Sequence, residues 1–136
     1  EGATGEIDTN YEGKMEAALE VLKDHDCTAI HIEAPDECTH NGDLEGKIQS
    51  LEWIDEKIVG PLTEKLRADG TDFRMLFLSD HKTLTSTRGH DADPVPFFIY
   101  DSRRDSKSGN TYCERDGEKG ITVDNGVKLM GMLFSE

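Results

Sequence analysis

Basic residues are scarce in this sequence, and this scarcity excludes one large class of partners. The 136 residues include 15 lysines and arginines against 29 aspartates and glutamates, a formal net charge of −14. Nucleic acids and anionic membrane surfaces attract proteins mainly through positive charge, so we expect neither as a partner. No apolar run approaches the roughly 20 residues that cross a bilayer, and no secretory signal is evident.

Cysteines are also few. Cys27, Cys38 and Cys113 are odd in number and form no CxxC pair, which favours reduced thiols in a cytoplasmic protein over a disulfide framework. The length favours a single domain, and no internal repeat is present. Because the chain opens on Glu1 rather than on Met, we expect a processed product, a trimmed chain or a fragment of a longer protein.

Apolar spacing predicts three helices. Thr9 and Glu12 form a capping-box pattern that predicts a first helix of about four turns. The strongest pattern runs through residues 44–66, where apolar residues recur every three or four positions. Pro61 lies inside this pattern and predicts a kink, or a break near residues 59–60. A last helix is expected over residues 125–134. The long stripe consists of Leu44, Ile48, Leu51, Ile54, Ile58, Leu62 and Leu66.

Three short β-rich segments are expected to form strands, over residues 27–34, 73–79 and 96–100. Residues 102–120 are polar, rich in glycine and without periodicity, so we expect a loop there. Strands and helices alternate along the chain. This order predicts an α/β fold with a mostly parallel sheet and helices on its faces.

Carboxylates and imidazoles gather just after the predicted strands. Asp36 and His40 follow the first strand, Asp80 and His81 follow the second, and His90 comes nine residues later. Ligands of open parallel sheets collect beyond the carboxyl ends of the strands, so we expect these side chains to converge. Oxygen and imidazole ligands together suit Mn²⁺, Zn²⁺ or Fe²⁺.

Each of these clusters also has an ordinary explanation, because aspartate and histidine are common in acidic loops. His31 lies within a predicted strand and is expected to be a hydrogen-bonded core or sheet-edge residue, whereas His25 is expected in a solvated turn. Trp53 lies beside the apolar stripe and is expected in the core or an interface. Cys38 lies between two candidate ligands and is expected to be a bystander.

Several ordered motifs resemble one known family. They are HIEAPDECTHNGDLEGKIQSLEWIDEKIVGPL at residues 31–62, FRMLFLSDH at 73–81 and TRGHDADPVPFFIYD at 87–101. The chain resembles the C-terminal part of the archaeal-type, 2,3-bisphosphoglycerate-independent phosphoglycerate mutases of the alkaline phosphatase superfamily. The opening GATGEIDTNYEGKMEAAL resembles the segment in which that family's chain returns from an inserted domain. The likeness covers nearly all 136 residues, with 102–120 the least similar part.

The resemblance implies a two-metal site and a phosphoryl-transfer reaction. Asp36, His40 and His90 would bind one divalent ion, and Asp80 and His81 the second; manganese, zinc, magnesium or cobalt are the implied metals. In this family a serine takes the phosphoryl group of 3-phosphoglycerate, and the phosphoserine returns it to form 2-phosphoglycerate. A two-metal site lowers the pKa of the serine and neutralises charge on the transferring group.

The same resemblance implies that residues 1–136 are only the C-terminal portion of a metal-binding, phosphatase-like domain. The nucleophilic serine, a further aspartate ligand and the inserted domain have no counterpart here, so the chain holds no catalytic nucleophile. The N-terminal part of the same enzyme is the implied partner, and without it we expect self-association through exposed apolar surface.

The loop after the second metal pair departs from the family pattern, because Lys82 and Gly89 replace an expected proline and threonine. Two alternatives therefore stay open. One is another phosphatase or phosphotransferase of the superfamily, such as a homoserine kinase-like enzyme. The other is a non-catalytic acidic module that binds a cation.

Overall fold

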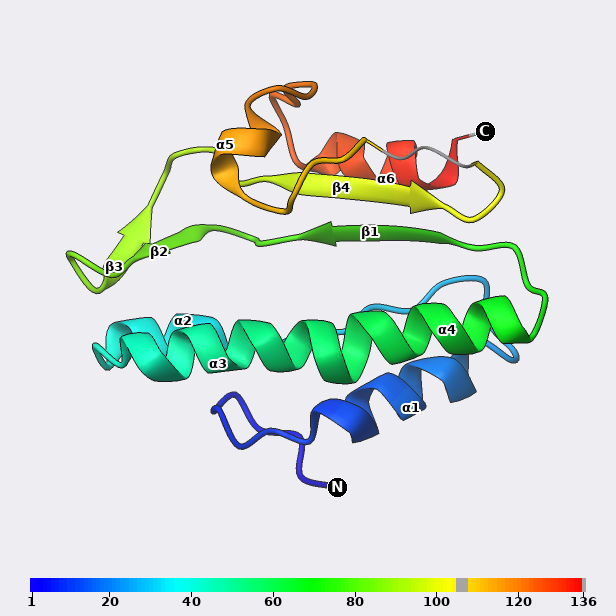
Figure 1. Cartoon of the computed structure of the whole chain (residues 1–136), viewed down its shortest axis with the longest axis horizontal. Coiled ribbons are helices and arrows are strands. Elements are labelled where there is room, and N and C mark those ends of the chain that lie inside the picture. Colours follow the sequence, from blue (N-terminus) through cyan, green and yellow to red (C-terminus); the bar gives the residue numbers. More distant parts are fainter. Residues whose placement is uncertain (105–107, 136) are drawn as a thin grey trace. The chain divides into compact units, whose positions relative to one another are not determined.

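The computed structural model describes residues 1–104 and 108–135, and these form two units (Figure 1). The first, which we call the helical unit, comprises Glu1–Asp69 and Thr83–His90. The second, the sheet unit, comprises Gly70–Lys82 and Asp91–Glu136. Each unit is described by itself below. No helix of the described residues is long and apolar enough to span a membrane.

A long helix dominates the helical unit. Helix α3 (Leu44–Ile54) continues through a π-helical turn, η1 (Asp55–Val59), into α4 (Gly60–Ala68) without interruption (Figure 1). The expected helix is confirmed. A kink or a break was expected near Pro61; the break is wrong, and the kink stays a prediction. Pro61 has no N–H to donate one turn back, and a wider turn accommodates this: the Gly60 N–H bonds the Asp55 carbonyl, five residues earlier.

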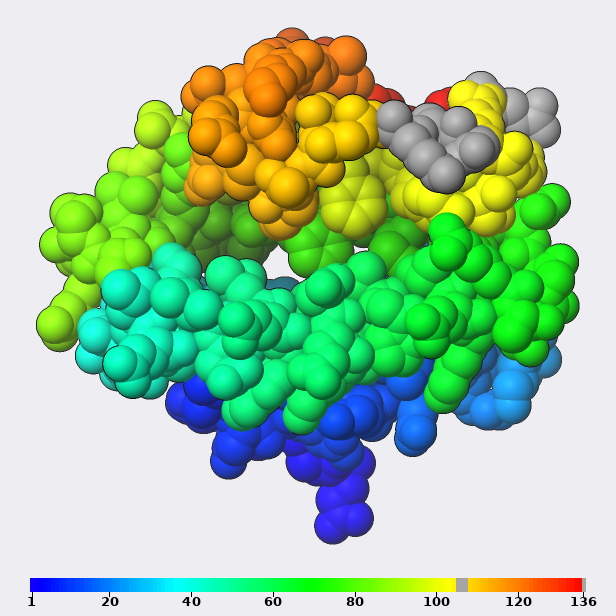
Figure 2. Space-filling model, in the orientation of Figure 1, coloured from blue at the N-terminus to red at the C-terminus, as the bar shows by residue number. Residues whose placement is uncertain are grey.

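The apolar stripe of this helix is buried at one end only. Ile58 and Leu62 are 4% and 9% exposed, and η1 packs on α1 (Tyr11–Val21). Three stripe residues of α3 remain about half exposed: Leu44, Ile48 and Leu51. Figure 2 shows atoms of the long helix, in cyan to green, lying uncovered on the face in view. The stripe therefore carries more apolar surface than the helical unit itself covers.

Helix α1 begins one residue later than the capping box predicted. Asn10 is the N-cap, and its side chain accepts a hydrogen bond from the Gly13 N–H at 2.8 Å. Thr9 is buried, and its hydroxyl accepts the Thr4 N–H instead. The ring of Tyr11, 2% exposed, meets Trp53 edge-on at 5.7 Å between centroids. Trp53 therefore belongs to the packing between helices, as expected.

The strand expected over residues 27–34 is not formed. Residues 27–33 form neither a helix nor a strand, and Thr28, Ile30 and Ile32 are half-buried while the residues between them are exposed. This alternation suits a strand, but no strand of the described residues pairs with the segment. A β-ladder needs the hydrogen-bonding groups of a neighbour. His31 is exposed rather than in the core, and its carbonyl accepts a hydrogen bond from Lys14 Nζ at 3.0 Å.

The sheet unit contains the other two expected strands, β1 (Arg74–Leu78) and β4 (Phe97–Asp101). They pair antiparallel, with Leu76 opposite Ile99, so the expected mostly parallel sheet is wrong. Parallel neighbours need a crossover connection, usually a helix. The chain between β1 and β4 has no helix and instead forms a short hairpin, β2 (Lys82–Leu84) and β3 (Gly89–Asp91).

Aromatic packing and one helix cover this antiparallel pair. Phe77 stacks on Phe98 at 5.4 Å, and Tyr112 meets Phe77 edge-on at 4.8 Å. Helix α6 (Val127–Phe134) packs on β1 and buries Leu129, close to the expected boundaries. The region expected to be a loop contains one short helix, α5 (Glu114–Gly117), while residues 105–107 of that prediction lie outside the described residues.

Candidate metal centre

Helix α2 (Ala34–His40) presents the first two candidate ligands on one face. Pro35 lies in its first turn, where a missing N–H costs nothing, and Asp36 is in the same turn, where negative charge is favoured. His40 is four residues later, one helical turn along. The sequence prediction placed these residues just after a strand and predicted no helix there. Proline, an acidic first turn and the i, i+4 spacing were the available signals for this helix.

The hairpin β2–β3 carries the third candidate ligand, His90. Its turn is closed by a hydrogen bond from the Arg88 N–H to the Leu84 carbonyl at 2.8 Å. Arg88 has a φ of 55°, in the left-handed region that side chains usually avoid, and Gly89 follows it. This turn reverses the chain so that His90 faces α2 and the Arg88 carbonyl points at His40.

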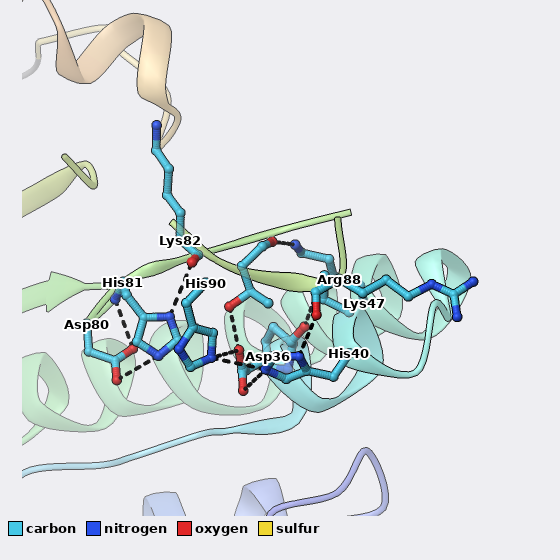
Figure 3. A network of polar contacts seen from close by, with 11 residues as sticks. Asp36, His40, Lys47, Asp80, His81, Lys82, Arg88 and His90 are labelled. Carbon is cyan, nitrogen blue, oxygen red and sulfur yellow. Dashed lines mark hydrogen bonds and ion pairs between the residues drawn. The ribbon is translucent and has the colours of Figure 1, made fainter. Parts of the chain in front are cut away.

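Asp36, His40 and His90 meet in the helical unit, with one ligand atom from each lying within 4.8 Å of the others (Figure 3). His40 Nε2 is 3.0 Å from His90 Nε2. The carboxylate of Asp36 bridges the two rings, with Oδ2 3.3 Å from His40 Nε2 and Oδ1 3.4 Å from His90 Nε2. The structure therefore brings together three of the five residues predicted as metal ligands.

A backbone carbonyl fixes the tautomer of His40. His40 Nδ1 is 2.7 Å from the Arg88 carbonyl oxygen, which can only accept a hydrogen bond, so Nδ1 carries the proton. In the neutral imidazole the lone pair is then on Nε2, the atom that faces Asp36 and His90. A second hydrogen bond that orients the coordinating nitrogen is typical of metal-binding histidines.

The separations among these atoms fit a divalent cation. Ligand atoms bound tetrahedrally about 2.0–2.1 Å from a zinc ion lie about 3.3–3.4 Å apart. Here His40 Nε2 lies 3.0 Å from His90 Nε2 and 3.3 Å from Asp36 Oδ2, and one ligand atom from each of the three residues lies within 4.8 Å of the others. The cluster is also open to water, because the His40 and His90 side chains are 36% and 54% exposed. A cation could therefore enter this site and keep coordination positions for other ligands.

Asp80 and His81, the other predicted pair, lie in the sheet unit directly after β1. Asp80 Oδ2 is 3.5 Å from His81 Nε2, and Asp80 Oδ1 accepts the His81 N–H at 3.1 Å. His81 Nδ1 is 3.3 Å from the Lys82 carbonyl oxygen. The position after a strand is as predicted. Their role as ligands of a second ion remains a prediction.

The neighbouring thiol and the remaining histidines are not part of the cluster. Cys38 is buried, and burial together with the nearby Asp43 carboxylate raises the pKa of its thiol, which keeps the sulfur protonated. His25 is exposed, with Nδ1 3.2 Å from the Val21 carbonyl. That Cys38 is a bystander stays a prediction, and His25 can serve as a control residue.

Sequence reasoning missed the residues that hold the candidate ligands. The Thr83 hydroxyl donates a hydrogen bond to Asp36, and Lys47 Nζ donates to the Thr83 carbonyl at 2.9 Å. These partners are 47 and 36 residues apart in the chain. No local pattern predicts contacts at such separations. The position of Thr83, two residues after His81, was the one available signal for its role.

Comparison with known proteins decides the family. Residues 1–126 match the family model described as the metalloenzyme superfamily. The chain belongs to the metalloenzyme superfamily. A cluster of one carboxylate and two imidazoles that could hold a metal ion is in keeping with this family, which implies divalent metal binding.

Individual relatives of this metalloenzyme chain agree with the resemblance found in the sequence. A protein of Methanothrix thermoacetophila named "2,3-bisphosphoglycerate-independent phosphoglycerate mutase" is 52% identical over 135 residues, 98% of this chain and 34% of the relative. A protein of the same name from Methanosarcina barkeri is 43% identical over the same shares. The chain thus spans about a third of the length of these curated relatives.

A solved structure has a similar fold. The PH0037 protein from Pyrococcus horikoshii is 26% identical and superimposes with a TM-score of 0.82. The match covers 98% of this metalloenzyme chain and 40% of that protein.

Proposed function

We propose that this chain supplies part of the two-metal centre of a cofactor-independent phosphoglycerate mutase, an isomerase that interconverts 3-phosphoglycerate and 2-phosphoglycerate. The observation that carries the proposal is the cluster of Asp36, His40 and His90, whose ligand atoms lie within 4.8 Å of one another. The names of the relatives supply the reaction.

Five residues of this chain have a role in the proposed centre. Asp36, His40 and His90 hold one divalent ion, and Asp80 and His81 contribute to a second. Two bound ions would neutralise charge on the transferring phosphoryl group and lower the pKa of an oxygen nucleophile. The nucleophilic serine that forms the phosphoserine intermediate, and the segment that holds the substrate, come from the rest of the parent enzyme. The chain alone is therefore expected to bind metal without turning over substrate.

The parent enzyme also provides the proposed partner of the chain. The apolar stripe of α3 leaves Leu44, Ile48 and Leu51 about half exposed, and the segment 27–33 pairs with no strand of the described residues. We propose that the N-terminal part of a cytoplasmic enzyme covers this surface. When the chain is alone, the same surface should cause self-association, which sedimentation velocity at increasing concentration would detect.

Metal binding is tested by comparing two histidines of the helical unit. His40→Ala should weaken Mn²⁺ binding to the chain far more than His25→Ala, because only His40 lies in the cluster. Isothermal titration calorimetry measures both affinities, and NMR shifts of the histidine rings on addition of Zn²⁺ identify the ligands. Selective shifts of His40, His81 and His90 are expected. If His40→Ala and His25→Ala lost the same amount of Mn²⁺ affinity, His40 could no longer be assigned as a metal ligand.

The mutase reaction is tested in a chimera, in which this chain replaces the matching third of the Methanothrix thermoacetophila relative. Conversion of 3-phosphoglycerate to 2-phosphoglycerate should survive the exchange and the His25→Ala control, and should be lost with His40→Ala. A chimera that folds and binds metal but acts only on another phosphorylated metabolite would favour a different phosphotransferase of the superfamily.

A further inference from the structure

Thr83 connects the hairpin to the candidate ligand Asp36. It lies in β2, and its hydroxyl donates a hydrogen bond to Asp36 Oδ1 on α2, 47 residues earlier in the chain. We infer that Thr83 is a positioning residue of the metal centre, which fixes the Asp36 carboxylate in the orientation that binds the ion. The inference rests on the proposed metal site and assigns a role to a residue that is not itself a ligand.

The hydrogen bond distinguishes the two oxygens of Asp36. A carboxylate turns easily about its last side-chain bond, since that torsion has broad minima. A donor on Oδ1 stops this rotation and keeps Oδ2 3.3 Å from His40 Nε2, where both atoms can face the same cation. Hydrogen bonds to coordinating carboxylates commonly serve this purpose. Thr83 therefore does for Asp36 what the Arg88 carbonyl does for His40.

Thr83 is itself held through its backbone. Lys47 Nζ, from the first turns of α3, donates a hydrogen bond to the Thr83 carbonyl at 2.9 Å. The branched Cβ of threonine restricts its side-chain rotamer, so fixing the backbone also fixes the direction of the hydroxyl. Because both its backbone and its side chain are held, Thr83 should keep the Asp36 carboxylate in one orientation.

One hairpin therefore orients the whole cluster. It provides His90 directly, the Arg88 carbonyl that sets the His40 tautomer, and the Thr83 hydroxyl that sets the Asp36 carboxylate. A preformed set of ligands loses less conformational freedom when a cation binds. Loss of the Thr83 hydroxyl should thus lower metal affinity without removing any ligand atom.

The test compares Thr83→Val, which keeps the shape but loses the hydroxyl, with Thr83→Ser, which keeps the hydroxyl. Titration calorimetry should show Mn²⁺ affinity falling about 10–100-fold in Thr83→Val, the range typical of lost outer hydrogen bonds. Thr83→Ser should stay close to the wild-type affinity. His40 and His90 should still shift with excess Zn²⁺ in Thr83→Val, because the ligands remain. If Thr83→Val does not fold, Thr83→Ala takes its place.

Controls separate positioning from a purely structural role. Thr85→Val changes an exposed threonine of the same hairpin turn and should leave Mn²⁺ affinity unchanged. Without metal, the melting temperatures of Thr83→Val and Thr83→Ser should stay close to that of wild type, even though the Mn²⁺ affinity of Thr83→Val falls. The inference would be overturned if Thr83→Val bound Mn²⁺ as tightly as wild type, or if Thr83→Ser lost as much Mn²⁺ affinity as Thr83→Val. Either result would leave the proposed metal site itself intact. Failure of the wild-type chain to shift His40 and His90 would instead overturn the proposed site and the inference with it.

Discussion

Each unit contains an aspartate that faces nitrogen atoms, but the nitrogen atoms differ in kind between the two units. In the helical unit, Asp36 faces two imidazole nitrogens, which can donate lone pairs to a cation. In the sheet unit, Asp101 is 7% exposed and faces three guanidinium groups, which are cations already. Its partners are Arg103 Nη2 at 2.9 Å, Arg74 Nε at 3.5 Å and Arg104 Nε at 3.7 Å.

We expect this difference to separate a metal-binding site from a structural anchor. Arg103 hydrogen bonds, opposed by burial, hold the pKa of Asp101 well below its usual range, so this carboxylate is neutralised within the protein. Arg74 also donates to the Leu133 carbonyl at 2.7 Å, which connects β1 to the end of α6. A carboxylate among imidazoles gains more from an added cation than a carboxylate among arginines does. The same residue type therefore predicts metal binding in one unit and stability in the other.

Exchanging each aspartate for asparagine should give opposite results, and this is the largest effect we expect. Asp101→Asn should markedly lower the melting temperature of the metal-free chain, because it leaves the arginines around a buried position without their counter-charge. Asp36→Asn should change that temperature little. With Mn²⁺ at 100 times its dissociation constant, wild type should gain about 2.7 kcal/mol and Asp36→Asn almost none. Calorimetric melting with and without Mn²⁺ measures both, and equal behaviour of the two variants would contradict the comparison.

Most helices and strands of both units were predictable because their signals are local. The spacing of residues 44–66 predicts the long helix, and short apolar runs predict β1 and β4 to within a residue or two. The wider turn at Asp55–Val59 was not predictable, since Pro61 indicates only that the helical hydrogen-bond pattern is interrupted, and not how the helix adapts. The direction of strand pairing was not either, because it depends on the connection between strands.

The convergence of Asp36, His40 and His90 was predictable from the sequence, but the elements that bring them together were not. Asp36 and His40 are one helical turn apart, and His90 follows a predicted strand, so the residue types were visible. The expected reason, convergence at the ends of parallel strands, was wrong, because a helix and a hairpin position these residues. Thr83 and Lys47 depend on contacts between distant segments, and a sequence read locally contains no signal for such contacts.

Acidification should sharpen the contrast between the units. Because the folded pKa of Asp101 lies below its unfolded value near 3.8, its contribution to stability is present above that value. It is lost as pH falls from about 4 through the folded pKa. Amide NMR signals of β1 and β4 should therefore weaken below pH 4 in wild type. In Asp101→Asn this pH dependence should be smaller, and an identical acid transition in both proteins would remove Asp101 as its cause.

A third carboxylate lies between these extremes and should give the smallest effect. Among the described residues, Asp116 has one cationic partner, Lys119. Together with the Thr111 N–H and hydroxyl, Lys119 lowers the pKa of Asp116 to about 2. Lys119→Gln should raise that pKa toward 3.8, measured by NMR titration of the carboxyl carbon. The melting temperature should hardly change, because the Lys119 side chain is exposed and such pairs contribute little.

The matched control for this variant is Lys128→Gln, which removes an exposed lysine from Asp124 and should leave Asp116 unaffected. If Lys119→Gln left the pKa of Asp116 near 2, the threonine hydrogen bonds alone would account for its shift. The series would then not be one of increasing cationic charge, from the imidazoles at Asp36, through one lysine at Asp116, to three arginines at Asp101. A raised pKa of Asp116 with an unchanged melting temperature in Lys119→Gln would support that order. A single exposed cation would then shift the pKa of a carboxylate without making that carboxylate important for stability.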